Sequence, residues 1–282
     1  MNRDVIGLIV LLALIIGFSL LLSIAGKYYI PNPESRKPTE IFGGNNQLAY
    51  LYLKYTYYPN DTSRTVLSPE AVTAIVWDFR GLDTLFETTV FYLAIIGALA
   101  LGRGLIKIEK PVGEHGLSII VKTVTRLTSV LIVTVAASIA LHGHLTPGGG
   151  FQGGSAAAVA PLLILIIFSI YYFLEKGISK TLMLIIRSIG LIVIGLVAIS
   201  CFIIGVIQGS EAFVFQNQRK IVGVYGEHSI EVSLPSHIAG ELISGTLWFF
   251  NIAEFFAVMA GFTIVFMLLF VPEKAFREGG GK

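Results

Sequence analysis

Ionisable side chains that could do chemistry lie at three places within or beside the long apolar stretches of this sequence. A charged group in an apolar environment is costly, so such groups usually face a protein interior or a water-filled path. Carboxylates in excess over basic residues can hold a proton or a cation, and histidine can transfer a proton near neutral pH. The residue types therefore predict an ion or proton path. The candidates are Asp78, Arg80, Asp83, Glu87, His142, His144 and Glu254.

The acidic cluster lies in the stretch VTAIVWDFRGLDTLFETTVFYLAIIGAL, which reads as one predicted helix. Arg80, Asp83 and Glu87 have the spacing i, i+3, i+7 and would line one face of that helix if it is continuous. Gly81 is the one position where it could break. Two interpretations are open. Asp78 and Asp83 suit a solvated helix end in which Arg80 pairs with Asp83, whereas for the deeper Glu87 we favour a site for a proton or a cation.

Two further ionisable residues lie within later apolar stretches. Glu254 is surrounded by aromatic residues in LWFFNIAEFFAVMAGF, and a single carboxylate in such a place is neutral or paired. Structural and functional roles are equally open for it. Arg187 lies near one end of its apolar stretch, so we expect its long side chain to extend toward the membrane surface.

The histidines open the string HGHLTPGGGFQGG, residues 142–154. We favour histidines that are hydrogen-bonded at a helix end, with a proton relay and metal ligation as the alternatives. In an extended stretch, side chains two residues apart lie on opposite faces, so His142 and His144 would not converge on a metal. No metal site is therefore predicted. A third ligand would have to come from a set in the last loop: His228, His237, Glu227 and Glu241.

The glycines of the same string predict a tight hairpin between two helices. Proline ends a helix and glycine permits positive φ where the chain reverses. The following GGSAAAVA would give a small-residue face that lets membrane helices pack closely. A nucleotide-binding loop is excluded, because no Lys-Ser or Lys-Thr pair follows at the required spacing. The hairpin residues are Pro147, Gly148, Gly149, Gly150, Gly153 and Gly154.

The composition places these residues in a lipid bilayer. The chain is 54% hydrophobic and 13% charged, about half the charge content of soluble domains, with a mean hydropathy of +0.78. A net charge of +2 gives no reason to expect nucleic acid as a partner. One cysteine, Cys201, excludes disulfides and cysteine-bound clusters, so no cofactor or redox centre is predicted. Six apolar stretches are long enough to span a bilayer: 5–26, 82–106, 121–142, 151–174, 182–208 and 244–271.

We therefore predict an all-α integral membrane protein with about six transmembrane helices. The first could be a cleaved signal peptide, but its apolar run is longer than usual for one, which favours a retained helix. The lysines and arginines near the helix ends place both termini in the cytoplasm and the glycine hairpin outside. A charged segment, KIEKPVGEHG, separates two helices from four, so we expect domains at 1–110 and 111–282.

The string GHLTPGGGFQGG resembles the signature GHxxPGGGFxGG of the B subunit of Mrp-type multisubunit Na+/H+ antiporters, called MnhB or MrpB. The resemblance covers about residues 111–271. The acidic stretch upstream is similar to the C-terminal part of the Mrp A subunit and to the E-type component of archaeal membrane-bound hydrogenases, over about residues 1–110. Both elements in one chain indicate a fusion of subunits that are usually separate.

The resemblance implies a transport subunit without enzyme activity of its own, which contributes part of a sodium or proton path. It also implies assembly with other Mrp-like subunits, and with a hydrogenase or related redox arm of a complex I-related assembly. The resemblance implies Na+ and H+ as the ions that the subunit meets, and the lipid of a prokaryotic plasma membrane around it. A purely structural subunit is the main alternative, and a histidine-dependent membrane metalloprotein is a third.

Overall fold

The computed structural model describes residues 16, 17, 20, 48–58, 65–101, 117–218 and 232–271. The chain divides into two compact units, Met1–Leu51 and Tyr52–Lys282, and every long helix of the described part belongs to the second. The predicted span 5–26 lies outside the described residues apart from three positions, and so do the segment 107–116 and both termini.

Five helical segments of the described part are long and apolar enough to cross a membrane. They confirm five of the six predicted spans, and they begin and end at Gly81–Ala100, Ile119–Leu141, Gly150–Glu175, Lys180–Gln208 and Thr246–Leu269. The elements are α3 (Leu48–Thr56), α4 (Ala71–Ala74), the π-helix η2 (Ile75–Phe79), α5 (Gly81–Leu101), α6 (Ile119–Leu141), α7 (Gly150–Ala157), α8 (Val159–Glu175), α9 (Lys180–Gln208) and α10 (Thr246–Leu269), with strands β1 (His237–Ile238) and β2 (Glu241–Leu242).

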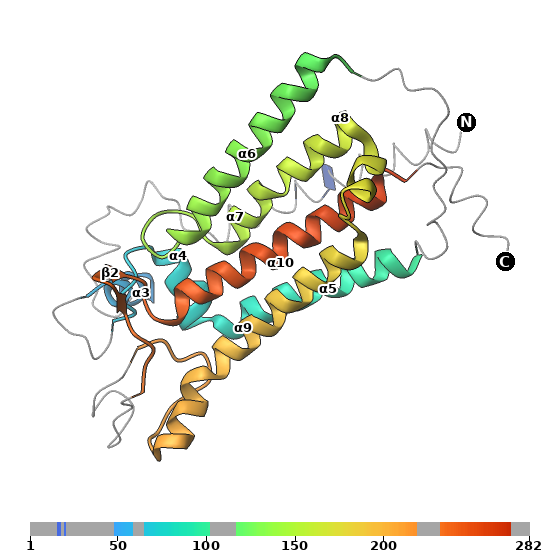
Figure 1. Cartoon of the computed structure of the whole chain (residues 1–282). Helices are drawn as coiled ribbons and strands as arrows, with labels where there is room; N and C mark the ends of the chain where they lie inside the picture. The colour runs from blue at the N-terminus through green and yellow to red at the C-terminus, as the bar shows by residue number, and fades with distance from the viewer. Residues whose placement is uncertain are drawn as a thin grey trace. The chain divides into compact units, whose positions relative to one another are not determined.

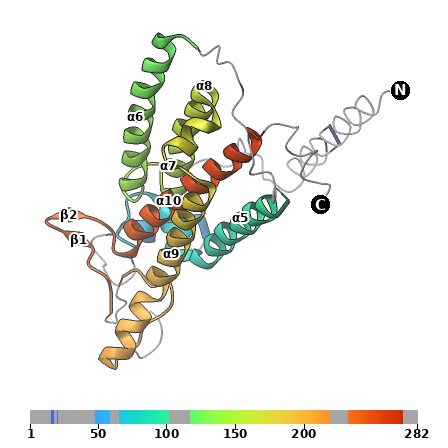
Figure 2. The same ribbon diagram turned by 45° about the vertical axis from the view of Figure 1, so that its right-hand side comes forward.

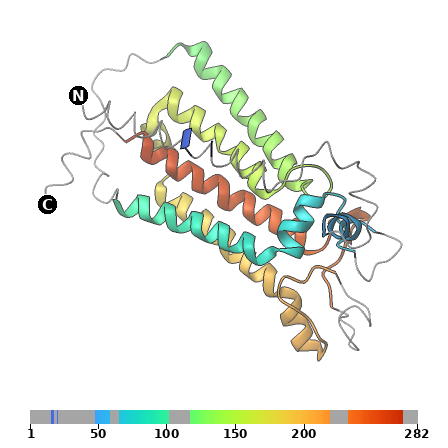
Figure 3. The same cartoon turned by 180° about the vertical axis from the view of Figure 1, so that it is seen from behind.

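Helix α10 is the central helix of the bundle. It runs between α5 and α9 on one side and α6, α7 and α8 on the other, as Figures 1 and 3 show from opposite sides. In an 18-residue apolar stretch of α10, 56% of the stretch is buried within the protein, against 33% or less in the corresponding stretches of the other four segments. Glycines of neighbouring helices let them approach α10 closely, as at Gly154 of α7 and Gly190 of α9. Figure 2 shows α6 reaching beyond the end of α8.

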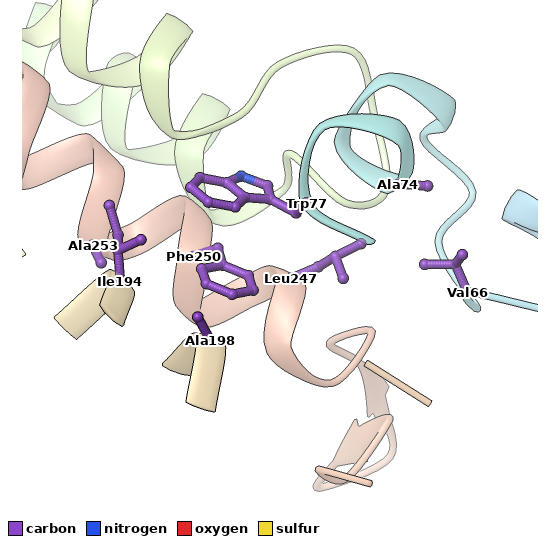
Figure 4. Packing of buried hydrophobic residues seen from close by; sticks show 8 residues of the cluster. All are labelled: Val66, Ala74, Trp77, Ile194, Ala198, Leu247, Phe250 and Ala253. Atoms are coloured by element: carbon purple, nitrogen blue, oxygen red, sulfur yellow. The ribbon is translucent and has the colours of Figure 1, made fainter. Parts of the chain in front are cut away.

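One aromatic cluster fixes η2 against α10. The rings of Trp77 and Phe250 stack with centroids 4.4 Å apart, and both side chains are fully buried (Figure 4). Ile194 and Ala198 of α9 contribute to the same cluster. The cluster therefore joins residues far apart in the sequence, and it lies at the same end of the bundle as the start of α10.

The glycines that follow the hairpin allow close helix packing. A Cβ at Gly153 would lie 2.7 Å from the carbonyl oxygen of Ala136 in α6, and one at Gly154 would lie 2.7 Å from that of Phe255 in α10. The predicted small-residue interface is thus confirmed, with one correction. Gly153 faces the preceding helix as expected, but Gly154 packs on α10, because successive helical residues point in different directions.

Candidate functional site

A polar cavity of about 260 Å³ lies where the glycine hairpin meets α10, η2 and α5. It draws residues from distant parts of the sequence and contains two carboxylates. Its lining consists of Val72, Thr73, Val76, Trp77, Thr84, Glu87, Gly148, Gly149, Gly150, Phe151, Gln152, Asn251 and Glu254.

The hairpin forms one wall of the cavity. Gly149 precedes α7 with φ of +139°, a conformation that side chains other than glycine rarely adopt. A Cβ at Gly150 would lie 2.5 Å from the carbonyl oxygen of Asn251 and 2.6 Å from Cβ of Glu254. The first turn of α7 therefore touches α10 directly. A glycine at each of these positions is a requirement of geometry.

The N-terminus of α7 provides hydrogen-bond donors to two side chains of α10. The backbone N–H of Gly150 donates to Oδ1 of Asn251 at 3.2 Å, and that of Phe151 donates to Oε2 of Glu254 at 3.1 Å. The first N–H groups of a helix have no partner within it, and the helix dipole places partial positive charge there. A carboxylate at this position is stabilised. Glu254, 6% exposed, is thus a paired residue whose partner is backbone.

Glu87 of α5 lines the same cavity, and its carboxylate interacts electrostatically with that of Glu254. Its side chain is exposed in the single chain, whereas Glu254 is buried. Of the seven ionisable candidates from the sequence, the cavity brings together these two. They come from distant parts of the sequence, separated by three transmembrane segments.

The rest of the acidic cluster lies outside the cavity. The helix is not continuous: η2 ends at Phe79, and Arg80 has φ of −134° and ψ of 33° before α5 begins at Gly81. Arg80 and Asp83 form an exposed salt bridge, with Nε donating to Oδ2 at 2.6 Å. This confirms the predicted pairing. A common face of Arg80, Asp83 and Glu87 was expected only for a continuous helix, and the helix breaks at the glycine junction, so Asp83 and Glu87 share α5 without Arg80. Asp78 is half-buried within η2.

A threonine compensates for the π-helix at the cavity wall. A π-turn and the break after it leave carbonyl groups without their usual partners, and Oγ1 of Thr84 donates to the carbonyl of Val76 at 2.6 Å. Thr88, one turn further along α5, donates to the carbonyl of Thr84 at 3.0 Å and is not among the lining residues. Thr84 is therefore the hydroxyl that this part of α5 presents to the cavity.

The two histidines have different surroundings. His144 is 2% exposed, and its Nε2 donates to the carbonyl of Leu242 at 2.7 Å. Its own carbonyl accepts hydrogen bonds from Ser68 Oγ at 2.9 Å and from the Glu70 N–H at 3.1 Å. His142 is exposed, and its Nδ1 donates to the carbonyl of Ser138 at 2.9 Å. His142 therefore makes the expected helix-end hydrogen bond, whereas the ring of His144 bonds to strand β2.

Burial lowers the pKa of His144, an effect that the hydrogen bond to the Leu242 carbonyl partly offsets and that nearby His142 reinforces. The neutral ring is thus favoured in the folded protein. Of the suggested third metal ligands, His237 and Glu241 lie on the exposed strands of the β1–β2 hairpin. His228 and Glu227 lie outside the described residues. Among the residues that the structure describes, no three His, Cys, Asp or Glu side chains lie together as metal ligands would.

The orientation predicted for the side chain of Arg187 is wrong. It is 1% exposed, so its side chain lies inside the bundle and does not extend to the membrane surface. Nη1 donates to the carbonyl of Ala257 at 2.6 Å, and the guanidinium carbon lies 4.3 Å from the centre of the Phe91 ring. Sequence spacing could not show this, because its acceptors are backbone carbonyls of other helices.

Comparisons with known proteins show the family of the chain. Residues 120–264, just over half of the chain, match the family model of the domain related to the MnhB subunit of Na+/H+ antiporters. An uncharacterised protein of Methanocaldococcus jannaschii is 28% identical over an alignment of 145 residues that covers 45% of this chain and 55% of that protein. The chain thus spans about half the length of this curated relative.

Two solved structures share the fold. A chain of the membrane-bound sulfane sulfur reductase, an archaeal respiratory membrane complex, is 26% identical with a TM-score of 0.56, covering 96% of this chain and 97% of that one. A chain of the Mrp complex from a Dietzia species is 16% identical with a TM-score of 0.56, covering 97% of this chain and 27% of that one. At this identity the second likeness concerns the fold alone.

Proposed function

Since this chain belongs to the family of domains related to the MnhB subunit of Na+/H+ antiporters, we propose that it is a membrane subunit of an Mrp-type antiporter module. In this proposal the cavity at the glycine hairpin is part of the path of the exchanged ions. Glu87 and Glu254 carry the function, and the hairpin holds Glu254 in place.

The observation that supports this proposal most strongly is the meeting of Glu87 and Glu254 in one cavity of a largely apolar bundle. Placing one carboxylate within a membrane is costly, and a second near it adds repulsion. A purely structural pair would combine opposite charges. Two acids together are instead suited to sharing one positive charge, either a proton or a metal cation.

The remaining polar groups of the cavity suit a sodium ion as the transported cargo. Hard monovalent and divalent cations prefer oxygen ligands. Besides the two carboxylates, the lining includes the hydroxyls of Thr73 and Thr84 and the side-chain amide of Asn251. Exchange then means that a proton and a sodium ion occupy the carboxylates alternately.

Several finer points belong to the same proposal. The stretch 1–110 corresponds to the C-terminal element of Mrp A or to the E-type hydrogenase component, and 111–282 to the MnhB element. The chain assembles with other Mrp-like subunits, and with a hydrogenase or related redox arm, in a prokaryotic plasma membrane. The glycine hairpin faces outward and both termini face the cytoplasm. The chain itself catalyses no reaction.

The test compares Glu87→Gln with Asp83→Asn in the assembled complex. Both changes neutralise a carboxylate on α5 one turn apart, but Asp83 pairs with Arg80 at the surface and lies outside the cavity. Sodium-dependent proton exchange in proteoliposomes should be lost or strongly slowed in Glu87→Gln and close to wild type in Asp83→Asn. Exchange at the wild-type rate in Glu87→Gln would refute the proposal. Loss of assembly in both variants would favour a structural subunit.

A further inference from the structure

Arg187 is a buried positive charge within a membrane-spanning helix. Its guanidinium donates to the carbonyl of Ala257 at 2.6 Å and to that of Thr88 at 3.5 Å. It also lies over the ring of Phe91. Arginine stays protonated in proteins, so this charge is fixed. In the part of the chain that the structure describes, its hydrogen-bond acceptors are carbonyl groups and not carboxylates.

The packing of α10 leaves space for this guanidinium. A Cβ at position 261 of α10 would collide with Nη1 and would lie 3.0 Å from Cζ, so Gly261 leaves the space that the group fills. The same Cβ would lie 3.0 Å from Cδ1 of Ile95, a member of a buried apolar cluster that also includes Met183 and Ile264. Arg187 therefore lies between polar surroundings on one side and an apolar cluster on the other.

The polar contacts of Arg187 are the carbonyl groups of Ala257 and Thr88, and both residues follow closely in sequence on the two carboxylates of the cavity. Thr88 directly follows Glu87 in α5, and Ala257 lies three residues after Glu254 in α10. Both helices run away from the glycine hairpin, so the guanidinium lies about one turn beyond the carboxylates. With a rise of 1.5 Å per residue and the length of the side chains, it is on the order of 10 Å from them. At that distance charges in a protein interior still interact.

We infer that Arg187 is the positioning charge of the cation site, which balances one of the two carboxylates so that the cavity holds one monovalent cation at a time. This inference rests on the proposed function. Two ionised carboxylates and one guanidinium carry a net charge of −1, and a single Na+ or H+ makes the site neutral. A site at membrane depth that remains charged is costly, so occupancy by one cation is favoured.

The same charge limits how tightly the cation is held and where it can go. Its repulsion weakens Na+ binding and so helps release. Beyond it lies the apolar cluster of Ile95, Met183 and Ile264, so the cation leaves the carboxylates toward the hairpin or sideways to a neighbouring subunit. With a separation on the order of 10 Å and an effective dielectric constant of about 20, the repulsion corresponds to roughly a tenfold change in affinity.

The test is the sodium dependence of exchange by the assembled complex in proteoliposomes. Arg187→Gln removes the charge and keeps hydrogen-bond donors, so the apparent KM for Na+ should fall about tenfold, while kcat falls because release is slower. A loosened structure would raise KM or leave it unchanged, so a lower KM separates the electrostatic role from packing. An unchanged or higher KM would overturn the inference.

Arg187→Lys provides the second arm and is decisive if Arg187→Gln does not assemble. It keeps the charge, so KM for Na+ should stay within about twofold of wild type, and a tenfold change would overturn the inference. Glu87→Gln, measured alongside, separates this inference from the proposed function. If Glu87→Gln exchanges normally, the proposed function fails. If it is inactive while Arg187→Gln has a wild-type KM, only the role of Arg187 fails.

Discussion

Gly150→Ala should damage the contact between α7 and α10 on which the cavity depends. The added Cβ would lie 2.5 Å from the carbonyl oxygen of Asn251, 2.6 Å from Cβ of Glu254 and 2.7 Å from its Oε2. Backbone cannot yield as a flexible side chain can, so α7 must move away. The two hydrogen bonds from Gly150 and Phe151, at 3.2 and 3.1 Å, would then lengthen or break.

The size of the effect follows from these contacts. Overpacking costs about 1–3 kcal/mol, and loss of a hydrogen bond costs roughly 1 kcal/mol, or about 1.5–3 kcal/mol when one partner is charged. The free energy of unfolding should therefore fall by about 3.5–7 kcal/mol. The decrease should appear in denaturant titrations of the purified subunit, followed by tryptophan fluorescence, to which Trp77 in the adjacent cluster contributes.

The matched control is Gly195→Ala in α9. A Cβ at Gly195 would meet nothing within 4 Å, so this change should be neutral or should stabilise the helix by up to about 1 kcal/mol. Both substitutions add one methyl group to a membrane helix. If Gly150→Ala unfolds within about 0.5 kcal/mol of the control, the close approach of α7 to Glu254 is not as described.

Three further predictions concern the same end of the bundle. Because the pKa of His144 is lowered from 6.5, the folded state binds fewer protons than the unfolded state, so the contribution of His144 to stability is full above about pH 6.5 and falls as the pH decreases below it. In His144→Gln the unfolding temperature should therefore decrease less on acidification, and an unchanged pH dependence would count against this prediction. Gly153→Leu should separate α7 from α6 and Gly154→Leu should separate it from α10, so each should lower the yield of assembled complex on gels, and normal assembly of both would disprove the packing. A cysteine at Thr146 should react with an impermeant maleimide from outside and one at Gly177 from inside, whereas the reverse would overturn the orientation.

Much of the fold could be predicted from the hydropathy and charge patterns of the sequence. Long apolar runs bounded by charges predict five of the helices, because a bilayer leaves few other structures for such runs. The interruptions were harder to predict. Gly81 was identified as a possible break, but the π-helix before it depends on the stacking of Trp77 against Phe250, which is a tertiary contact.

The residues of the candidate site could be predicted from the sequence, but their arrangement in space could not. Glu87 and Glu254 were singled out because acids are rare in apolar runs, but spacing along the chain cannot show that they share a cavity. The partners of Glu254 and Arg187 could not be predicted, since they are backbone N–H and carbonyl groups of other helices. The sequence feature that corresponds to the buried guanidinium of Arg187 is Gly261 in α10, because the missing side chain of this glycine leaves the space that the guanidinium fills.

The central claim, that Glu87 and Glu254 hold the same ion, is tested most directly by a double-mutant cycle on sodium-dependent exchange. The measurement compares Glu87→Gln, Glu254→Gln and the double variant in complexes with matched assembly. Residues that act as one unit are strongly non-additive, so the double variant should exchange no more slowly than the slower single variant. If the losses of the two single variants multiply in the double variant, the carboxylates act independently and the shared site is contradicted.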